Sequence, residues 1–160
     1  MSDVSTASPR TIISLRRRIS IADLQQFQGE ALGLLWQAIQ ASNGRQTGAV
    51  FVRYWSMSET DTDVEVGIPT DGVAAIVPLQ EGILPGGTQV VHRHLGAHDR
   101  LGAAYEMLAA AVADRAPAGP PWEEYEWIPQ NSAPAPASWP APSAWTTLLV
   151  QPLADAGETP

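Results

Sequence analysis

The sequence contains no cysteine and no lysine, and each absence excludes a kind of chemistry. Without cysteine the chain has no disulfide, no thiolate metal ligand and no thiol nucleophile. All nine basic residues are arginines, so no lysine amine is present to form a Schiff base with a carbonyl substrate. The sequence therefore excludes disulfide scaffolds, thiolate metal sites, and covalent catalysis by cysteine or lysine.

Long apolar runs are also missing, because no stretch approaches the ~20 residues that a transmembrane helix needs. Residues 1–9 are polar and lack the apolar core of a secretory signal, so we expect a cytoplasmic protein that does not enter a membrane. The net charge of -8 disfavours nucleic acid, since phosphate binding needs a basic surface. Arg16–Arg18 is best interpreted as a solvated strand end, and we expect no direct DNA binding by this chain.

What is present is the composition of an ordinary globular protein, with 44% hydrophobic residues and a mean hydropathy of -0.09. A chain of 160 residues is long enough for one domain with a real core. The two ends are polar or rich in small residues, which is typical of frayed termini. We therefore expect a single domain over residues 10–153, with a flexible N-terminus at 1–9 and a flexible C-terminus at 154–160.

The first half of the chain is predicted to contain a strand, a helix and two further strands. An extended run begins at Thr11. Apolar residues then recur at helical spacings of three and four, at Leu24, Phe27, Ala31, Leu35 and Ala38. Ser20 is placed to cap this helix and Asn43-Gly44 to end it. Residues 48–55 are rich in β-branched and aromatic side chains, and residues 62–68 alternate apolar and polar ones, so both are predicted strands.

The second half follows the same plan. A turn leads into a predicted strand at residues 88–95, after which Asp99 is placed to cap a second helix. The apolar face of that helix consists of Leu101, Ala104, Tyr105, Leu108, Ala111 and Val112. Residues 122–128 and 145–151 are the last two predicted strands, and a Pro/Ala-rich loop at 129–142 connects them.

The order of elements is therefore β-α-β-β twice, with residues 73–79 as a further strand candidate between the halves. Strands that alternate with helices are compatible with a parallel doubly wound sheet, but the short turns between paired strands favour antiparallel hairpins. We predict an α+β fold with two β-α-β-β modules, at about residues 10–80 and 81–153, whose antiparallel sheets surround a central cleft. A pseudo-twofold relates the modules, and the groove between them is where a ligand is expected.

Four segments between residues 84 and 127 carry a resemblance to a known family. They are Leu84-Pro-Gly-Gly87, Leu95-Gly-Ala-His-Asp99, Leu101-Gly-Ala-Ala-Tyr105 and Gly119-Pro-Pro-Trp-Glu-Glu-Tyr125. This region resembles the GyrI-like, or AraC effector-binding, domain family, whose members read Gly-Pro-Tyr-Asp, then a helical tyrosine, then a Gly-Pro-Pro loop before a Glu-x-Tyr strand. Residues 63–69 extend the resemblance into the first half more loosely.

The resemblance implies a tandem pair of small α+β modules that bind hydrophobic, cationic or aromatic drug-like compounds in the central cleft, for sensing or sequestration. Such multidrug-binding domains occur behind DNA-binding helices in bacterial transcription regulators and also alone. Fewer than ten residues precede the first predicted strand, so this chain resembles the stand-alone type. Two features depart from the family: Ala97-His98 replaces Pro-Tyr, and the loop at 129–142, which contains Trp139, is longer and is placed to cover the cleft.

The Glu-x-Tyr match points to the binding residues. Strand alternation places Glu123, Tyr125 and Trp127 on one face, and Trp122 and Glu124 on the other. By resemblance the first face lines the cleft. A carboxylate among aromatic rings suits an organic cation, because charge attraction is joined by cation–π attraction of roughly 0.5–2 kcal/mol per ring. The alternative is that Glu123 pairs with an arginine or faces solvent.

Further aromatic residues are candidates for the same cleft, namely Tyr54, Trp55, Trp36, Tyr105 and Trp145. Tyr54 and Trp55 are neighbours at the end of the matching strand of the first half, so only one of them is expected to face the cleft. Trp36 and Tyr105 lie on the predicted helices, where packing in the core is the alternative. Trp145 is structural unless its strand pairs with that of Glu123.

We expect neither a metal nor a cofactor. His92 and His94 share a strand face and His98 follows closely, but this spacing is not that of a metal site. The sequence has no phosphate-binding loop, no Rossmann glycine pattern and no serine-nucleophile elbow. The chemistry therefore depends on carboxylates and aromatic side chains.

Binding of a lipophilic small molecule is the leading functional hypothesis, and two alternatives use the same chain. If the protein is an enzyme, Glu123 is the candidate general acid/base of a hydrolase that detoxifies reactive compounds, and Tyr125 donates a hydrogen bond to a carbonyl oxygen. The family resemblance also implies a protein partner such as DNA gyrase. The sequence leaves the oligomeric state open.

Overall fold

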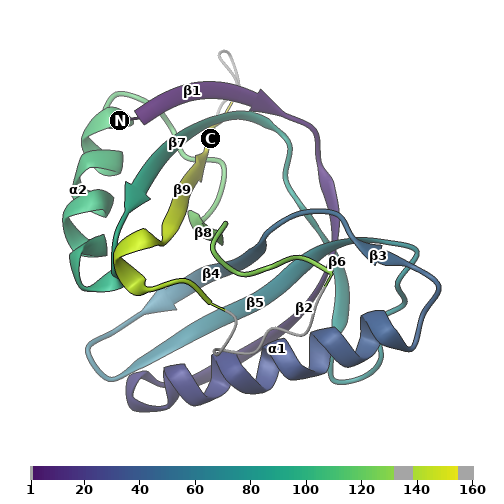
Figure 1. Cartoon of the computed structure of the whole chain (residues 1–160). Helices are drawn as coiled ribbons and strands as arrows, with labels where there is room; N and C mark the ends of the chain where they lie inside the picture. The colour runs from purple at the N-terminus through teal and green to yellow at the C-terminus, as the bar shows by residue number, and fades with distance from the viewer. Residues whose placement is uncertain (1, 132–138, 155–160) are drawn as a thin grey trace.

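The computed structural model describes residues 2–131 and 139–154, which form an α+β fold on a single antiparallel sheet (Figure 1). The elements in chain order are β1 (Ser2–Ala7), β2 (Arg10–Ser20), the 3₁₀ helix η1 (Ile21–Asp23), α1 (Leu24–Gln40), β3 (Arg45–Gln46), β4 (Val50–Met57), β5 (Asp61–Asp71), β6 (Gln80–Leu84), β7 (Gly87–Leu95), the 3₁₀ helix η2 (His98–Arg100), α2 (Leu101–Ala111), β8 (Trp122–Tyr125), the 3₁₀ helix η4 (Pro142–Ala144) and β9 (Thr146–Pro152). None of the helices in these ranges combines the length and the apolar character that a bilayer crossing requires.

The strand order shows two related modules that meet in the middle of the sheet. The order is β1-β7-β9-β8-β4-β5-β2-β6, and β3 pairs with the end of β5. The units β2-α1-β4-β5 and β7-α2-β8-β9 therefore meet at the β4–β8 pair. Outward from this pair the strand order is β4-β5-β2 in one unit and β8-β9-β7 in the other, so corresponding strands take corresponding places. The predicted tandem of β-α-β-β modules with antiparallel sheets is confirmed.

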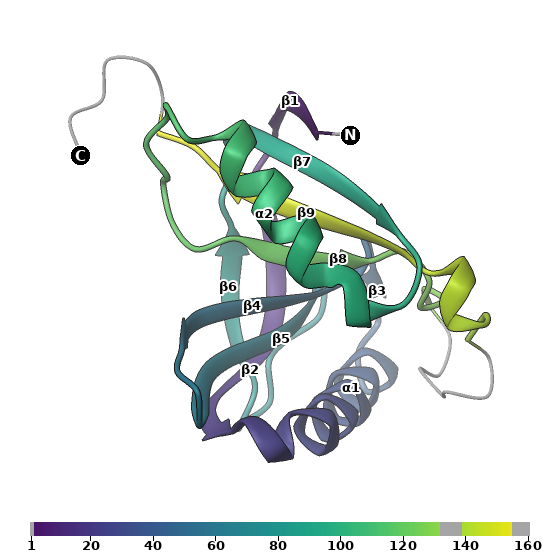
Figure 2. The same cartoon turned by 90° about the vertical axis from the view of Figure 1, so that its left-hand side faces the viewer.

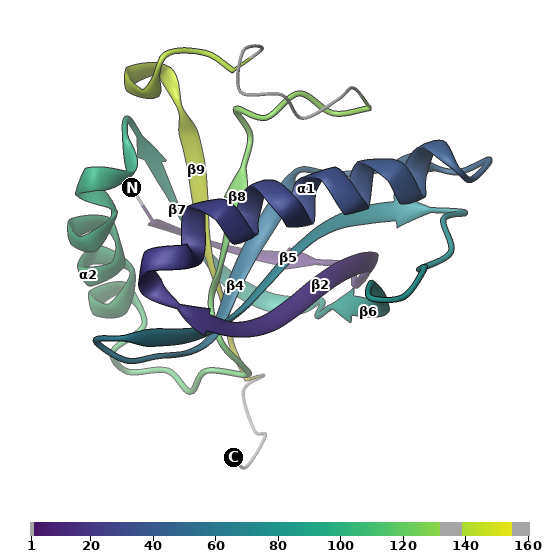
Figure 3. The ribbon, with the colours of Figure 1, turned by 90° about the horizontal axis from the view of Figure 1, so that it is seen from below.

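Both helices cover the same face of the sheet. Val52 of β4 is opposite Glu123 of β8, and Glu123 is opposite Leu149 of β9. Residues paired in this way point to one side. Val52 belongs to the core beneath α1 and Leu149 to the core beneath α2, so Glu123 lies between the two helix-covered cores. Figure 3 shows α1 across the β2–β5 half of the sheet and α2 beside β7 and β9.

The other face of the sheet buries a core of its own, because the sheet curls into a half-barrel (Figure 2). This third cluster consists of Ile12, Phe51, Leu84, Trp122 and Val150. Gly67 is required here, since a Cβ atom at that position would lie 2.5 Å from the ring of Phe51. The absence of a side chain on β5 lets the Phe51 ring rest directly against the strand.

The N-terminal segment departs from the sequence-based expectation. Instead of a flexible tail, residues 2–7 form β1 and pair with β7 over the register from Ser2–His92 to Ala7–Gly87. Most side chains of β1 are exposed, so the strand carries no hydrophobic pattern and depends on backbone pairing with a distant segment. At the other end, residues 155–160 of the expected flexible C-terminus lie outside the described residues.

Four local features also differ from prediction. Residues 73–79 are not a strand: Val73 and Leu79 are buried in the α1 core, whereas Val77 is 91% exposed, and β6 follows only at Gln80. Asp99 lies inside η2 and makes no capping bond, because Arg100 occupies the N-cap of α2. β8 ends at Tyr125 rather than at residue 128, since a turn follows it. Ser20 does cap a helix, by accepting from the backbone of Ala22, but the helix is η1.

Candidate functional site

A cavity of about 380 Å³ lies between the first half of α1, the sheet and the chain that follows β8. Its lining residues are Gln25, Gln28, Gly29 and Leu32 of α1, Val50, Val52 and Val66 of the sheet, His98, Tyr125, Trp127 and Ile128, and Trp139 and Trp145. We call this cavity the tryptophan chamber. Residues 132–138 of the Pro/Ala-rich loop are outside the described residues, but Trp139 from its end lines the chamber.

The aromatic wall of the tryptophan chamber is a continuous stack. The rings of Trp127 and Trp145 lie 4.0 Å apart at an angle of 8°, and Tyr125 stacks on Trp127 at 5.0 Å. Trp139 meets Trp127 edge to face at 5.0 Å. Its indole N–H is buried and has no hydrogen-bond partner within residues 2–131 and 139–154. Flat rings of this kind offer a large contact area at low entropic cost.

A second cavity, of about 450 Å³, adjoins the first and contains the buried carboxyl group. It is lined by Ile21, Ala22, Leu24, Gln25 and Gln28, by Tyr54, and by His98, Leu101, Glu123 and Tyr125. We call it the carboxylate chamber. It opens beside the start of both helices, so residues from η1, α1 and α2 surround a carboxyl group that the sheet presents between them.

Glu123 is 3% exposed and accepts two short hydrogen bonds. The hydroxyl of Tyr105 donates to one carboxylate oxygen at 2.6 Å and that of Tyr125 to the other at 2.7 Å. Among the described residues no arginine or histidine forms an ion pair with it. The adjacent Glu124, on the opposite face, is paired with Arg10 at 2.5 Å. Two neighbouring carboxylates of one strand thus differ in that only one has a counter-charge.

The environment of Glu123 raises the pKa of its carboxyl group. Burial raises the pKa of Glu123 above its ordinary value, and the hydrogen bonds from Tyr105 and Tyr125 partly oppose this shift because they stabilise the carboxylate. Burial and the nearby Glu123 charge raise the pKa of Tyr54, Tyr105 and Tyr125. The three phenols therefore stay protonated and act as donors in the physiological pH range.

His98 is a lining residue of both chambers. Its Nε2 lies 2.9 Å from the hydroxyl of Thr147, and its ring centre lies between 5.1 and 5.7 Å from those of Tyr125, Trp127 and Trp145. Burial, with a smaller contribution from His94, lowers the pKa of His98. His98 was not among the site residues predicted from the sequence. The available signal was the departure from the family motif, in which Ala97-His98 replaces Pro-Tyr.

The structure brings together six of the residues selected from the sequence. Glu123, Tyr125, Trp127, Tyr54 and Trp145 line one or both chambers, and Tyr105 binds the carboxylate of Glu123. Trp36 does not line either chamber and packs, partly buried, against the α1 core.

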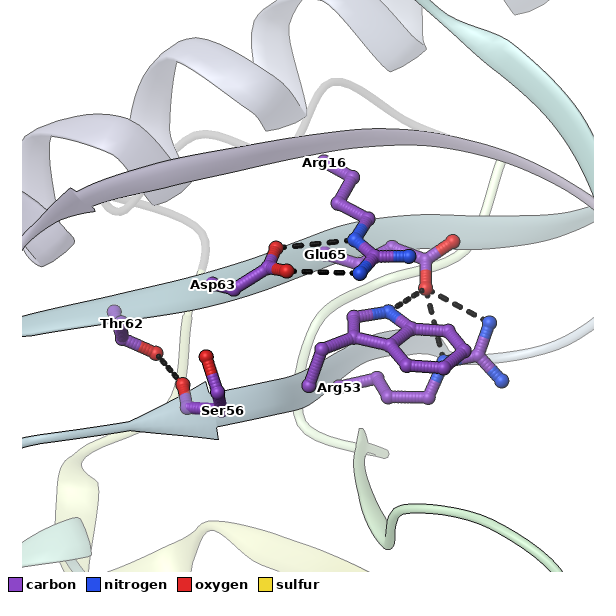
Figure 4. Close-up of polar contacts among 7 residues, drawn as sticks. Arg16, Arg53, Ser56, Thr62, Asp63 and Glu65 are labelled. Atoms are coloured by element: carbon purple, nitrogen blue, oxygen red, sulfur yellow. Dashed lines mark hydrogen bonds and ion pairs between the residues drawn. The ribbon is translucent and has the colours of Figure 1, made fainter.

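Trp55 lies on the face of the sheet that is turned away from the helices. Its indole N–H donates to Glu65 at 2.9 Å, and the guanidinium groups of Arg16 and Arg53 lie 4.2 and 4.7 Å from its ring. Figure 4 shows the surrounding ion pairs, Arg16 with Asp63 and Arg53 with Glu65. The open choice between Tyr54 and Trp55 is therefore settled in favour of Tyr54 as the residue that lines the cleft.

The histidines do not form a common site. His92 contacts the hydroxyl of Ser2, His94 contacts the carbonyl oxygen of Ala97, and His98 belongs to the cleft. Within the described ranges no three histidine, aspartate or glutamate side chains are grouped so that they could hold a metal ion.

Comparison with solved structures shows the fold that the chain shares with other proteins. No protein-family profile and no curated protein sequence matches it. It is similar to EcmrR in an EcmrR–DNA complex (TM-score 0.77, 20% identity), covering 98% of this chain but only 58% of EcmrR. The separate C-terminal domain of EcmrR matches with a TM-score of 0.67 and 18% identity over 98% of both chains. SAV2435 bound to tetraphenylphosphonium matches with a TM-score of 0.67 and 11% identity, over 96% of this chain and 94% of that one.

Proposed function

We propose that this protein binds lipophilic organic cations in the cleft between its two modules, as a GyrI-like domain that senses or sequesters such compounds. The observation that carries the proposal is the buried carboxyl group of Glu123, which has two phenolic donors but no cationic partner among the described residues. A bound cation supplies the missing counter-charge.

The surroundings of Glu123 favour an organic cation over a hydrated inorganic one. Removing a carboxylate from water costs free energy unless it is paired, and the same cost falls on a cation that must shed its hydration to reach the buried Glu123. A lipophilic cation loses little hydration on entering the cleft. It gains charge attraction from Glu123 and contact with the stacked rings of Tyr125, Trp127 and Trp145.

Two independent likenesses support the same function. Residues 84–127 resemble GyrI-like domains, including the Glu-x-Tyr pair that here is Glu123 and Tyr125. The fold is that of SAV2435, which was solved with tetraphenylphosphonium, a lipophilic cation. The resemblance to EcmrR, which was solved in a complex with DNA, supports a relation to DNA-associated proteins.

The proposal predicts a charge-selective cleft. Tetraphenylphosphonium is expected to quench the tryptophan fluorescence saturably, whereas tetraphenylborate, which has nearly the same shape and the opposite charge, is not. Glu123→Gln is expected to weaken tetraphenylphosphonium binding at least about 30-fold, equivalent to ~2 kcal/mol, because the buried ion pair is lost. Fluorescence titration and calorimetry at pH 7.5 measure both.

Glu106→Gln is the matched control, since Glu106 is exposed on α2 next to Tyr105 and its replacement removes the same formal charge. This variant is expected to bind tetraphenylphosphonium like the unmodified protein. Equal affinity for the cation and the anion, or loss of binding in both variants alike, would show that Glu123 is not the ligand's counter-charge.

A second candidate function uses the same carboxyl group. The raised pKa of Glu123 suits a general acid/base. Tyr105 and Tyr125 each donate their one hydroxyl proton to Glu123, so a phenol stabilises a developing oxyanion only after it has given up that hydrogen bond. Hydrolysis of a hydrophobic ester such as p-nitrophenyl butyrate would then proceed for many turnovers per protein molecule and fall at least about 100-fold in Glu123→Gln. Release of at most one equivalent of nitrophenol leaves binding as the function.

A further inference from the structure

The cleft consists of two chambers of different chemistry that share a boundary. Gln25, Gln28, His98 and Tyr125 line both chambers. Glu123 lines only the carboxylate chamber, whereas Trp127, Trp139 and Trp145 line only the tryptophan chamber. The charge that attracts a cation and the rings that hold an aromatic group therefore occupy separate compartments of one cleft.

Each chamber is large enough for a ligand group of its own. Their volumes of about 380 and 450 Å³ both fall in the range of roughly 300–1,000 Å³ that is typical of complete small-molecule pockets. A compact cation that occupies one chamber leaves the other to solvent. A molecule that extends through both gains the two sets of contacts in a single binding event.

We propose that the preferred ligands of this cleft are bipartite, with a cationic group in the carboxylate chamber, a flat aromatic group in the tryptophan chamber and a short linker across the shared boundary. The inference rests on the proposed function and specifies its ligand class. The aromatic group packs against the Trp127–Trp145 stack, and the cation pairs with Glu123.

The boundary residues fit a linker rather than a third binding group. His98 is held by its contact with Thr147 at 2.9 Å and by the rings around it. Tyr125 is held by its hydrogen bond to Glu123. Gln28 and the exposed Gln25 place flexible amides on the α1 side. The linker of a bipartite ligand therefore passes between the fixed rings of His98 and Tyr125 on one side and the flexible amides of Gln25 and Gln28 on the other.

Simultaneous occupancy by two fragments tests the inference without any mutation. Tetramethylammonium is the probe for the carboxylate chamber, 2-naphthol for the tryptophan chamber, and 2-(2-naphthyl)ethyl-trimethylammonium combines them. Saturation with 2-naphthol is expected to change the Kd of tetramethylammonium less than about twofold, because separate sites act independently. The linked compound is expected to bind at least about 100-fold more tightly than either fragment. Calorimetry measures all three affinities.

Two variants test which fragment binds in which chamber. Glu123→Gln is expected to weaken tetramethylammonium and the linked compound at least about tenfold and to leave 2-naphthol unchanged. Trp145→Leu is expected to weaken 2-naphthol and the linked compound and to leave tetramethylammonium unchanged. Trp145→Phe keeps a ring in place if the leucine variant does not fold, and Trp36→Leu is the control for a tryptophan outside both chambers.

The outcomes separate this inference from the proposed function. Competition between the two fragments, or a linked compound no tighter than its better fragment, overturns the bipartite ligand. Glu123-dependent binding of tetraphenylphosphonium in the same experiments then leaves the proposed function standing. If tetraphenylphosphonium and every fragment fail to bind, the proposed function itself is wrong.

Discussion

Glu123→Gln is expected to make the ligand-free protein more stable at pH 8, by on the order of 1–3 kcal/mol, the usual cost of an incompletely compensated buried polar group in mutational data. The carboxylate is buried without a counter-charge, and glutamine has nearly the same shape. Its amide oxygen still accepts hydrogen bonds from Tyr105 or Tyr125, so most of the local network is retained. Under the proposed function, Glu123 would lower the stability of the protein in exchange for ligand binding, a trade-off common at functional sites.

The raised pKa of Glu123 determines how the stability difference between the two proteins depends on pH. The folded protein binds the Glu123 proton more tightly than the unfolded chain does, because burial raises the pKa of Glu123 above its ordinary value. Below pH 4.5 the group is protonated in both states and costs nothing, whereas stability is lost as pH rises through the raised pKa. The advantage of Glu123→Gln should therefore be present at pH 8 and nearly absent at pH 4. The half-buried His98, whose pKa is lowered, destabilises both proteins equally at low pH and cancels in the comparison.

Urea unfolding followed by tryptophan fluorescence, at pH 4 and at pH 8, measures the difference between the two proteins. Glu106→Gln, at an exposed position, should change the free energy of unfolding by less than about 0.5 kcal/mol at either pH. A Glu123→Gln variant that is less stable than the unmodified protein by the same amount at both values would mean that the carboxylate stabilises the fold through its hydrogen bonds.

Arg53→Met is expected to destabilise the protein by about 3–5 kcal/mol, because it leaves a buried carboxylate without its cation. Glu65 accepts hydrogen bonds from Arg53 Nε at 2.9 Å and from Ser14 Oγ at 2.7 Å, and the Arg53 and Glu65 side chains are only 8% and 4% exposed. Figure 4 shows how this pair lies between β4 and β5. The loss would appear as a lower Tm and a lower urea midpoint.

A double variant shows whether Arg53→Met loses stability because Glu65 is left unpaired or because packing is lost. Arg53→Met with Glu65→Leu is expected to recover most of the stability, since apolar groups of similar volume often replace a buried ion pair at little cost. Asp63→Asn, in the more exposed pair with Arg16, should cost no more than about 1 kcal/mol. If the double variant is no more stable than Arg53→Met, the contribution of Arg53 is packing rather than charge compensation.

The sequence predicted the modules because their signals are local. The apolar spacing of α1 and α2, and the alternation in β5, depend only on which face of each element meets the core. β1 was missed since its side chains are mostly exposed and its stability comes from pairing with β7. Residues 73–79 are misleading in the opposite way: they are apolar, but Ile76 and Val77 are exposed and only Val73 and Leu79 are fully buried in the core.

The site was predictable where strand alternation governed it. The face shared by Glu123 and Tyr125 follows from their spacing on β8. The partners of Glu123 did not follow from spacing, because Tyr105 reaches it from α2, which only the tertiary fold brings to that place. Spacing also did not predict the place of Trp55, which joins the ion-pair cluster on the other face by donating to Glu65. Nor did it predict that of His98, which lies in a turn without any periodic pattern.

The pairing of β1 with β7 sets an order of events during synthesis. Ser2 and His92, which are neighbours in the folded protein, are 90 positions apart in the chain. At roughly 5–20 residues per second, β1 leaves the ribosome on the order of 5 to 20 s before its partner. The first module has time to form while residues 2–7 wait unpaired. Their serines, threonine and aspartate make this waiting segment a poor template for pairing with other nascent chains.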